Sequence, residues 1–581
     1  MVHVGIDLGT SNTVVSYFEN GELKEHQIDN ADLIPSVIYV EEQAGRRTVG
    51  RAAVEEWADP DFSAASSFRR WKLSMGENRV LGELAVGGGK KKTPITPEQL
   101  TTWLVEYVVG TIADGVGGRA VESAVVTVPH GWRREHPERS AATRSAAAAA
   151  VVAGKPLTIR DLTLSEPVAA AGYWLWEARR DPAHLADEFV GRTILVVDIG
   201  GGTFDLSLVR VGPPETPLVV VDANNNDIAG DFASALILAR ATARANDELG
   251  TEFPTDAGEL LQLLSSGETA WIRSWFLTAE NAVREISSRI ARATARGRGE
   301  PVPLRLSFEL PDGEVSIQIS KAEFHATLQP FYQAGRELLR NFLAMQAPDD
   351  LPHGVVFAGG GSRIEGIVDQ IVLPALEDRE LPDPREVLGR IAMNDRRVDR
   401  AVALGAALVA AGEIQVEERL LYDVGIEIKV PSRIARKLGV GNASTSVVVS
   451  PILARASKLP ASASSKAVIG NMSIAPGESY DFKIVVFDDL TEPFVQTWSQ
   501  KHPAGGSRAE VSVQLTADTD GLLTVDINLE NGAGRQTVTG AISRKRGGRA
   551  YIELGEGDAP PLHRVTPDEL RKAVAAEKGA R

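Results

Sequence analysis

One short pattern constrains this chain more than any other: an apolar strand, an aspartate and a glycine-rich turn, present twice. The first copy is Ile6–Thr10 (IDLGT), and the second is Val197–Thr203 (VDIGGGT), about 190 residues further on. A motif that recurs at this spacing predicts an internal duplication in which each half opens on the same strand and turn. Strands and helices alternate around both copies over roughly 410 residues, which predicts an α/β fold.

Composition excludes several classes of protein. The 581 residues exceed what one compact core holds, and the net charge of −16 argues against a nucleic-acid partner bound through its phosphates. Because the chain has no cysteine, disulfides, thiolate catalysis and Cys-ligated zinc are excluded. The first residues lack a signal-peptide pattern, and no apolar stretch reaches the ~18 residues of a membrane helix. We therefore expect a soluble, cytoplasmic, multidomain protein with no membrane span.

Local patterns predict the elements of the first 412 residues. A turn signal at Glu19–Gly21 predicts a β-hairpin, with a third strand at Ser36–Val40. Helices are expected at Thr96–Ile112, over the Ala-rich segment Ser140–Ala153, from Asp231 to about Arg296, and at Ala401–Ala411. Short apolar runs predict buried strands at Ala124–Val128, Ile194–Val197, Leu206–Val209, Leu218–Val221 and Val355–Ala358.

Beyond Gly412 the pattern becomes β-rich. We expect a first domain at 1–412, a connector at 413–424, an all-β sandwich domain at 425–543, and a short tail at 544–581. The tail begins with basic residues and ends in a helix over Thr566–Glu577, which the sequence TPDE caps. The strands expected in the sandwich are Val424–Val430, Ser446–Leu453, Ser479–Phe487, Ala509–Thr516 and Leu522–Leu529.

The repeated turns carry the chemistry. Gly9 lets the backbone come close to a ligand, so that N–H groups and the hydroxyls of Thr10 and Ser11 can meet phosphate oxygens. Asp7 offers the oxygen ligand that Mg²⁺ prefers. A plain hairpin turn explains the first copy equally well, but the second copy, with Asp198, supports a clamp for a polyphosphate and its metal. Neither turn is a Walker A loop, because the GK[ST] sequence is missing.

A third glycine-rich segment follows the strand at Val355–Ala358. Gly359 and Gly360 offer flat backbone on which a nucleoside could lie, and Arg363 could stack on a base. A simple strand-to-helix loop explains this segment equally well.

Six motifs occur in family order: GIDLGTSN, VVTVP, LSEPVAAA, VVDIGGGTFD, VVFAGGGSRI and AVALGAA. Together they resemble the ATPase domain of the seventy-kilodalton heat-shock chaperones, the DnaK family, within the actin/hexokinase-like superfamily. The resemblance runs from residue 4 to about residue 411. It implies a two-lobed, actin-like (ribonuclease-H-like) ATPase domain, here followed by the β-sandwich.

The resemblance also implies roles for individual residues. The metal-associated carboxylates would be Asp7, Asp198 and Asp205, and the catalytic residues Lys72, Glu166, Asp198 and Thr203. The nucleotide would be bound by Gly9, Thr10, Ser11, Asn12, Gly200, Gly201, Gly202, Thr203, Gly230, Glu280, Arg284, Ser287, Gly359, Gly360, Arg363 and Asp399.

Two positions depart from the family's pattern. The motif around Lys72 is loose, so that Arg69 or Arg70 could be the equivalent residue. Val283 stands where the family usually has lysine, which removes one polar contact to the nucleoside.

For function, the resemblance implies a chaperone that binds ATP or ADP with Mg²⁺ and hydrolyses ATP slowly to regulate the binding of client polypeptide. J-domain proteins and nucleotide-exchange factors would be its partners. Segments Ile452–Pro460 and Ser512–Val525 resemble, more faintly, the family's substrate-binding β-domain. The 544–581 tail is too short for the family's helical lid, so we expect a lid-truncated member.

The connector carries the apolar pair Leu420 and Leu421, which we expect to dock on the ATPase domain in one nucleotide state. An alternative alignment moves the linker to Val416–Leu421. Two alternative functions stay open: a nucleotide-switched scaffold for one dedicated partner, and a sugar kinase. The sugar kinase is disfavoured because no sugar-binding acidic base stands out and because a β-domain follows.

Overall fold

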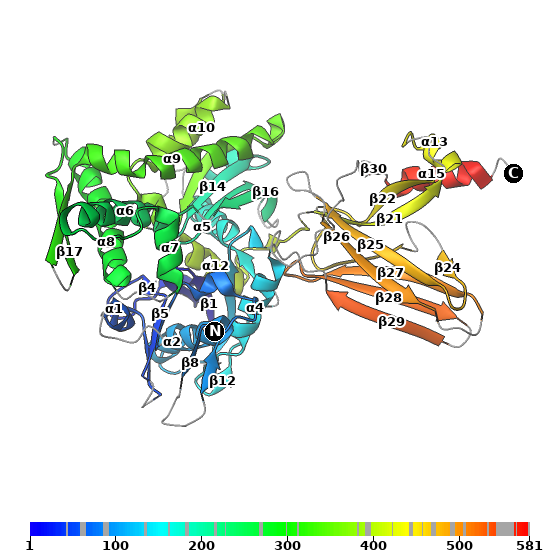
Figure 1. Cartoon of the computed structure of the whole chain (residues 1–581), viewed down its shortest axis with the longest axis horizontal. Coiled ribbons are helices and arrows are strands. Elements are labelled where there is room, and N and C mark those ends of the chain that lie inside the picture. The colour runs from blue at the N-terminus through cyan, green and yellow to red at the C-terminus, as the bar shows by residue number, and fades with distance from the viewer. Residues whose placement is uncertain are drawn as a thin grey trace. The chain divides into compact units, whose positions relative to one another are not determined.

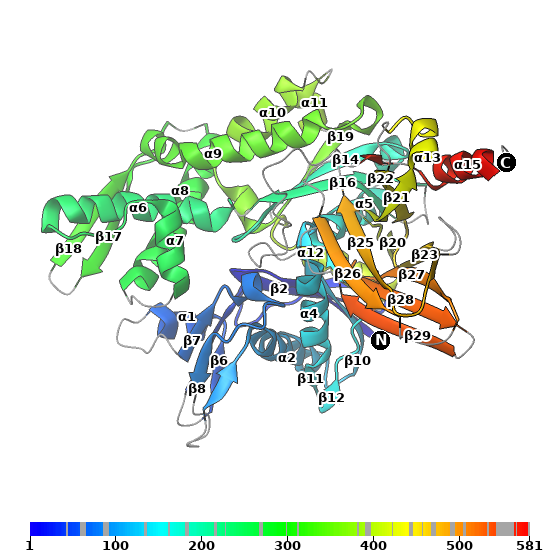
Figure 2. The ribbon, with the colours of Figure 1, turned by 45° about the vertical axis from the view of Figure 1, so that its right-hand side comes forward.

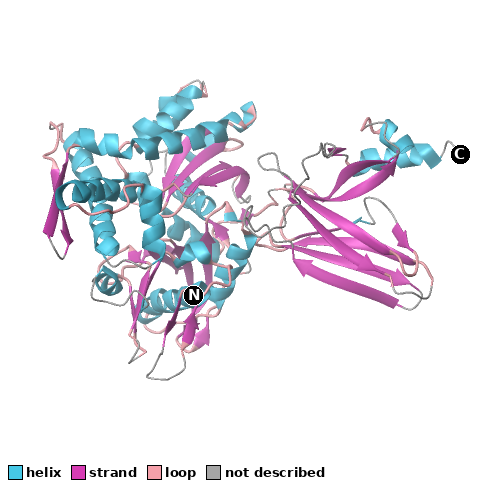
Figure 3. Ribbon diagram, in the orientation of Figure 1, coloured by secondary structure: helices cyan, strands magenta, loops and turns pink. Residues whose placement is uncertain are grey.

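The structure is a computed structural model of the 581-residue chain. It describes residues 1–41, 45–58, 66–84, 92–132, 136–160, 163–180, 185–213, 218–226, 228–266, 271–297, 299–310, 313–379, 381, 383–389, 397–420, 422–440, 445–455, 457–465, 472–487, 494–502, 507–531, 534–541, 563–564 and 566–578. The chain divides into two compact units, Met1–Gly131 with Arg139–Val416, and Glu417–Arg581 with Trp132–Glu138. Figure 1 labels the elements. Figure 3 colours helices and strands differently, and it shows that one unit mixes both whereas the other consists mostly of strands.

The first unit contains two sheets of related topology. In the first sheet β1 (Val2–Leu8) pairs antiparallel with β2 (Asn12–Glu19) and parallel with β10 (Val121–Val128). Its remaining strands are β13 (Leu164–Ser165), β3 (Glu22–Glu25) and β4 (Ile34–Pro35).

The second sheet repeats this arrangement. Here β14 (Thr193–Ile199) pairs antiparallel with β15 (Phe204–Arg210) and parallel with β19 (Pro352–Ala358). Next to β15 lie β16 (Leu218–Asn226) and β20 (Val416–Glu417). The common topology is what the duplicated motif predicts, because each copy forms the turn of a hairpin whose first strand has a parallel neighbour.

Strand β14 is buried on both faces, as a strand between two helical layers must be. Leu195, Val197 and Ile199 pack into one hydrophobic cluster, whereas Ile194 and Val196 pack into another. The alternation follows the period of two along a strand. The second sheet therefore lies between two hydrophobic cores. This packing fixes the position of the turn between β14 and β15.

Two helices join the sheets. Helix α12 (Ala401–Ala411) packs on β1, β2 and β10, and α5 (Glu166–Arg180) packs on β14, β15 and β19. Figure 2 shows both helices between β2 and the strands β14 and β16. They cross at close range, because a Cβ added to Gly405 of α12 would lie 1.9 Å from the carbonyl oxygen of Ala169 in α5. The small residues of AVALGAA thus permit backbone contact between the lobes.

Other helices cover the two sheets. The described helices of the first unit also include α1 (Arg51–Ala58), α2 (Pro97–Gly115), α4 (Pro137–Ala148), α6 (Gly230–Leu249), α7 (Ala257–Ser266), α8 (Trp271–Ala295), α9 (Lys321–Ala344), α10 (Leu373–Asp378) and α11 (Pro384–Gly389). Its smaller sheets consist of β5 (Val37–Val40) with β6 (Arg47–Val49) and β7 (Ser67–Arg69), β8 (Gly82–Leu84) with β9 (Thr93–Ile95), β11 (Val151–Val152) with β12 (Lys155–Pro156), and β17 (Leu304–Leu310) with β18 (Gly313–Ile319).

Two local predictions were wrong in detail. The strand expected at Ser36–Val40 exists as β5, but it pairs with β6 and β7 instead of extending the first hairpin, whose third strand is β3. The helix expected at Ser140–Ala153 ends with α4 at Ala148, because Ala153 (φ +50°) and Gly154 (φ +77°) form the turn of the β11–β12 hairpin. A run of alanines favours helix locally, but the strand pairing of β11 with β12 overrides it.

The second unit is a β-sandwich. One sheet has the order β26–β25–β21–β22–β30, and the other β23–β27–β28–β29 with β24 beside β27. The strands are β21 (Asp423–Pro431), β22 (Thr445–Leu453), β23 (Ala461–Ser464), β24 (Met472–Ile474), β25 (Ser479–Phe487), β26 (Phe494–Lys501), β27 (Ala509–Ala517), β28 (Leu523–Asn531), β29 (Gly534–Ala541) and β30 (His563–Arg564).

Two helices of this unit pack against each other, and a small apolar cluster lies beneath them. Helix α15 (Pro567–Lys578) contacts α13 (Ser432–Lys437) and β22, and Leu570 packs with Ala435 and Val448. The predicted cap is confirmed: Thr566 Oγ1 accepts from the N–H of Glu569, whose carboxylate accepts from the Thr566 N–H.

The connector residue Leu420 was predicted to dock on the ATPase domain, but in this structure it packs in the second unit. Leu420 is 2% exposed and packs in the sandwich core with Tyr422, Val424 and Leu459. Its N–H donates to the carbonyl of Ser457 over 2.8 Å. Leu420 is therefore a core residue of the second unit, where full burial of a leucine side chain contributes about 1.5–3 kcal/mol. Leu421 lies outside the described residues.

Within the described parts of the chain, the structure holds no helix that is both long and apolar enough to cross a bilayer.

Replacing Leu420 with aspartate tests its place in the core. Burying a carboxylate among apolar side chains should lower the free energy of unfolding of the second unit by about 3 kcal/mol or more. Urea unfolding or calorimetry that resolves the two units measures this change. Leu249→Asp is the matched control, because Leu249 is 40% exposed. An unchanged stability of the second unit in Leu420→Asp would contradict the burial.

Candidate functional site

A cavity of 880 Å³ lies between the two hairpin turns of the first unit. All residues that the sequence predicted for the site line this cavity except Asp205, which lies in β15 behind it. Segments from every part of the first 400 residues thus converge on one space: both glycine turns, Lys72, the start of α5, one face of α8 and the turn after β19.

The first turn, Gly9–Ser11, is held by two hydrogen bonds from Ser36. Ser36 Oγ donates to the carbonyl of Gly9 over 2.8 Å, and the Ser36 N–H donates to the carbonyl of Ser11 over 2.9 Å. With its carbonyls bound from this side, the turn has a fixed shape. Thr10 and Ser11 are 6% and 5% exposed and line the cavity.

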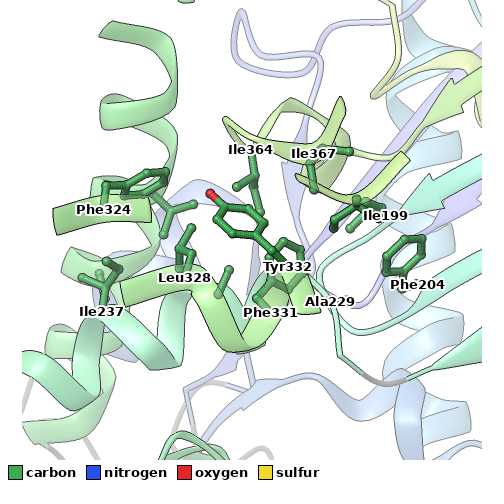
Figure 4. Packing of buried hydrophobic residues seen from close by; sticks show 14 of the residues in the cluster. Ile199, Phe204, Ala229, Ile237, Phe324, Leu328, Phe331, Tyr332, Ile364 and Ile367 are labelled. Carbon is green, nitrogen blue, oxygen red and sulfur yellow. The ribbon is translucent and has the colours of Figure 1, made fainter. Parts of the chain in front are cut away.

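The second turn, Gly200–Thr203, is anchored by apolar residues at both ends. Ile199 before it and Phe204 after it are fully buried in the larger core of the unit. Figure 4 shows both side chains in this cluster, with Tyr332 and Ile367 from the elements that cover it. The Gly200 N–H donates to the carbonyl of Thr203 over 2.9 Å, which closes the turn.

The two turns touch each other, which explains their glycines. A Cβ on Gly201 would lie 2.1 Å from Ser11 Oγ, and one on Gly202 would lie 2.8 Å from Thr10 Oγ1. Any side chain at these positions would push the turns apart. The pair of turns therefore forms one continuous surface of backbone and hydroxyl groups along the cavity.

Helix α6 begins against the second turn and supports it. The N–H groups of Gly230 and Asp231 donate to the carbonyls of Gly200 and Gly201 over 3.0 and 2.7 Å. Ser11 Oγ donates to Asp231 Oδ1 over 3.1 Å, which ties the first turn to the same helix. The sequence motif pointed to Gly230 but not to Asp231, whose role depends on a contact across 220 residues.

Lys72 and Glu166 form a buried ion pair at the cavity wall. Lys72 Nζ lies 2.7 Å from Glu166 Oε1, and the residues are 4% and 7% exposed. This distance is that of a charge-assisted hydrogen bond. The pair brings one cation to the side of the cavity where the acidic residues gather.

Three aspartates beside this pair have raised pKa values. Burial and the charge of Glu166 raise the pKa of Asp7 to about 7, against the opposing effects of Lys72 and of Thr127, whose hydroxyl lies 3.4 Å from Oδ1. The same two causes raise the pKa of Asp205 to about 7. Burial, followed by the charges of Glu166, Asp205 and Asp7, raises the pKa of Asp198 well above its usual range.

These acids suit a bound cation. Asp198 Oδ2 and Asp205 Oδ1 are buried without a hydrogen-bond partner, and a positive charge nearby would satisfy both. Across the described residues, no three His, Cys, Asp or Glu side chains converge closely enough to form a metal cage by themselves. The donor set therefore fits Mg²⁺, which keeps several waters and shares its coordination with phosphate oxygens.

One face of α8 forms the opposite wall. Glu280, Val283, Arg284 and Ser287 line the cavity with helical spacing. Glu280 accepts from Arg69 over 2.8 Å and also pairs with Arg284. Burial would raise the pKa of Glu280, but the two arginines lower it overall.

The turn after β19 completes this wall. Arg363 donates to Asp399 Oδ1 over 3.1 Å, and both side chains line the cavity. The N–H of Glu365 donates to Ser287 Oγ over 3.1 Å, which connects this turn to α8.

The geometry separates Lys72 from its neighbouring arginines. Arg69 is bound to Glu280 and lies over the rings of Trp57 and Phe276, whereas Arg70 Nε lies 3.1 Å from Asp231 Oδ2. Arg70 has a left-handed backbone (φ +63°), which is uncommon outside glycine. Of the three cations, Lys72 is the one paired with Glu166.

The fold and the site define a class: a two-lobed actin-like ATPase domain that precedes a β-sandwich. Comparison with known proteins agrees. The family model described as "Hsp70 protein" matches residues 3–547. This chain belongs to the Hsp70 family.

Curated relatives carry the same family name. The chain is 25% identical over 551 residues to "Chaperone protein DnaK" of Halobacterium salinarum, which covers 92% of this chain and 74% of the relative. It is 26% identical over 464 residues to "Chaperone protein DnaK" of Metamycoplasma hominis, with 79% and 65% covered. The family rests on the match of the family model, and these relatives agree with it.

The raised pKa values of Asp7 and Asp205 predict that stability depends on pH. In the unfolded chain aspartate loses its proton near pH ~4, whereas Asp7 and Asp205 keep theirs in the fold until about 7. Because the folded state binds more protons in this window, stability should fall as pH rises from about 4 to about 7. The slope should be shallower in Asp7→Asn, measured by thermal unfolding without divalent cations.

Asp349→Asn is the control, because Asp349 is exposed and lies in a short turn outside the cavity. It should keep the pH slope of the unsubstituted protein. Equal slopes in Asp7→Asn and Asp349→Asn would contradict the raised pKa of Asp7.

Proposed function

We propose that this protein binds ATP with Mg²⁺ between its two lobes, hydrolyses it slowly, and uses the nucleotide state to regulate the binding of polypeptide to its β-sandwich. One observation carries the proposal: residues spread from Asp7 to Asp399 surround a single cavity, with the Lys72–Glu166 ion pair on its wall. A cytoplasmic location and partners of the J-domain and exchange-factor classes remain predictions from the family.

The phosphates would lie along the two turns. The turns offer backbone N–H groups and the hydroxyls of Thr10, Ser11 and Thr203, which suit anionic oxygens. Mg²⁺, when bound, would neutralise charge on the phosphate oxygens. Asp7, Asp198 and Asp205 would hold it, directly or through water.

Lys72, Glu166 and Asp198 would orient the attacking water and stabilise charge in the transition state. Phosphoryl transfer requires little covalent chemistry from the protein, so positioning and electrostatics account for most of the rate. The adenosine would lie between α8 and the turn after β19, where Glu280, Arg284, Ser287 and Arg363 line the wall. Val283, which also lines this wall, would make one polar contact fewer with the nucleoside than the lysine usual in the family.

The second unit would bind polypeptide through its sheets. A β-sandwich with free edges can pair with an extended segment, and pockets then select its side chains. The alternative, a scaffold for one dedicated partner, is favoured by one observation. At the outer edge of β22, Val448 and Val449 already pair with β30 of the same chain, so an extended peptide cannot pair with these two residues while β30 is in place.

Three substitutions test the hydrolysis mechanism. Asp198→Asn removes a charge from the acid cluster, and Lys72→Met removes the cation paired with Glu166. Each should slow single-turnover hydrolysis of ATP by ~10²-fold or more, because both groups act on the transition state. Thr203→Ala should have an effect of the same size. The basal rate of the unsubstituted protein should be far below tens per second; a faster rate would favour a small-molecule kinase.

Arg69→Met is the matched control, since it removes a neighbouring cation that is paired with Glu280 instead of Glu166. The chemical step should stay within about threefold of the unsubstituted protein. A larger loss in Arg69→Met than in Lys72→Met would assign the catalytic cation to Arg69 and overturn the role of Lys72.

An array of short peptides tests the role of the second unit. Binding to many unrelated apolar peptides, with affinity that changes between ADP and ATP, is the expected result for a chaperone. The chain should lose this nucleotide dependence in Asp198→Asn. Binding to one native partner and to no short apolar peptide would contradict the chaperone and support the scaffold.

A further inference from the structure

The end of strand β10 (Val121–Val128) and the residues that follow it make three contacts at or next to the acid cluster. Thr127 Oγ1 donates to Asp7 Oδ1 over 3.4 Å, and the N–H of Gly131 donates to the carboxylate of Asp205. Between them, His130 Nδ1 lies 2.7 Å from Ser165 Oγ. Sequence reasoning included none of Thr127, His130 and Ser165 in the site.

Ser165 is the last residue before helix α5, whose first residue is Glu166. The strand that contains it, β13, pairs in parallel with the end of β10, with Ser165 opposite Val128. His130 is 1% exposed and Ser165 is fully buried. The bond between their side chains therefore links two backbone segments in a dry environment, where it is stronger than at a surface.

We propose that His130 is a positioning residue for Glu166. Through Ser165 Oγ it fixes the chain at the step from β13 into α5, and so sets the Glu166 carboxylate at a defined distance from Asp7 and Asp205. The proposal rests on the proposed ATPase function, since it assigns a residue to that site.

Accurate placement matters because the segment at the end of β10 positions three of the acids, Asp7, Asp205 and Glu166. Thr127 and Gly131 hold two of them directly, whereas Glu166 is held through His130 and Ser165. If the last link is lost, Glu166 shifts relative to the other two. A misplacement of ~1 Å in a catalytic group can slow a reaction by ~10²-fold.

The imidazole atom that makes the contact allows a sharp test. Nδ1 is bonded to Cγ, and an asparagine side chain carries a polar atom at the same position. A glutamine carries its amide one bond further out, where Nε2 of histidine would be. His130→Asn should therefore keep the link, and His130→Gln should lose it although it is closer to histidine in size.

The experiment measures single-turnover hydrolysis of ATP and the dissociation constant of ADP in the full-length protein. His130→Ala, His130→Gln and Ser165→Ala should each slow hydrolysis by ~10-fold and leave ADP affinity within about twofold. His130→Asn should stay within about threefold of the unsubstituted protein. The double variant His130→Ala/Ser165→Ala should be no slower than either single variant, because both remove one bond.

His3→Ala is the matched control. His3 Nδ1 lies 2.9 Å from Ser123 Oγ, which makes the same kind of pair in the same unit, and neither residue lines the cavity. It should leave hydrolysis unchanged. Should His130→Ala fail to fold, Ser165→Ala removes the same bond by deleting one oxygen, and the rates of Ser165→Ala and His130→Asn carry the test.

Several results would overturn the proposal: His130→Asn as slow as His130→Ala, single effects that multiply to ~10²-fold in the double variant, or ADP affinity that falls as much as the rate. Normal hydrolysis in both His130→Ala and Ser165→Ala would overturn it while the ATPase function stands. A complete lack of hydrolysis by the unsubstituted protein would overturn the ATPase function and this proposal together.

Discussion

The mutual repulsion of buried carboxylates is the constraint on which the first unit depends. The charge of Glu166 raises the pKa of Asp7, Asp198 and Asp205, and Asp205 and Asp7 add to the shift of Asp198. Lys72, whose Nζ lies 2.7 Å from Glu166 Oε1, opposes these shifts. Buried like charges are unfavourable unless they are held in place and compensated. The scaffold must therefore be stiff, and the binding of a cation with an anionic ligand would relieve the strain that it stores.

The acids are held in fixed positions by the strands and the helix that contain them. Asp7, Asp198 and Asp205 lie on strands β1, β14 and β15, and Glu166 starts helix α5. All four supporting elements pack into the cores of the unit. Helix α5 and helix α12 cross at backbone distance, which joins the two sheets without a bulky layer between them. The two turns can then meet, because glycines stand where they touch.

Sequence reasoning predicted much of this because the informative features are local. The motif of a strand, an aspartate and a glycine turn occurs twice. Each copy spans only a few residues, so both copies can be recognised in the sequence alone. The cavity lining follows from the same motifs, with Asp205 as the exception. Asp205 lies directly opposite Asp198 in the β14–β15 hairpin but does not line the cavity, and burial is the main cause of its raised pKa.

What sequence reasoning missed depends on long-range contacts. Asp231, Ser36 and His130 are ordinary residues in the chain, and their importance comes from side-chain hydrogen bonds to partners that lie 27 to 220 residues away. Leu420 is a similar case: an apolar residue in a charged connector gives no sign of which core it will join. The prediction of one helix over Ser140–Ala153 was also wrong at its end, because the residues around Ala153 form the β11–β12 hairpin and this pairing overrides local helix propensity.

The place of Leu420 changes how the two units can communicate. On one side of the connector, β20 lies beside β16, and the carbonyl of Gln415 accepts from the Leu218 N–H. On the other side, the carbonyl of Glu418 accepts from the N–H of Leu459. Each end is thus fixed to its own unit, and an extended chain spans at most ~3.6 Å per residue. Only Val416 and Glu417 separate Gln415 from Glu418, so the backbone between these two hydrogen-bonded residues has little slack.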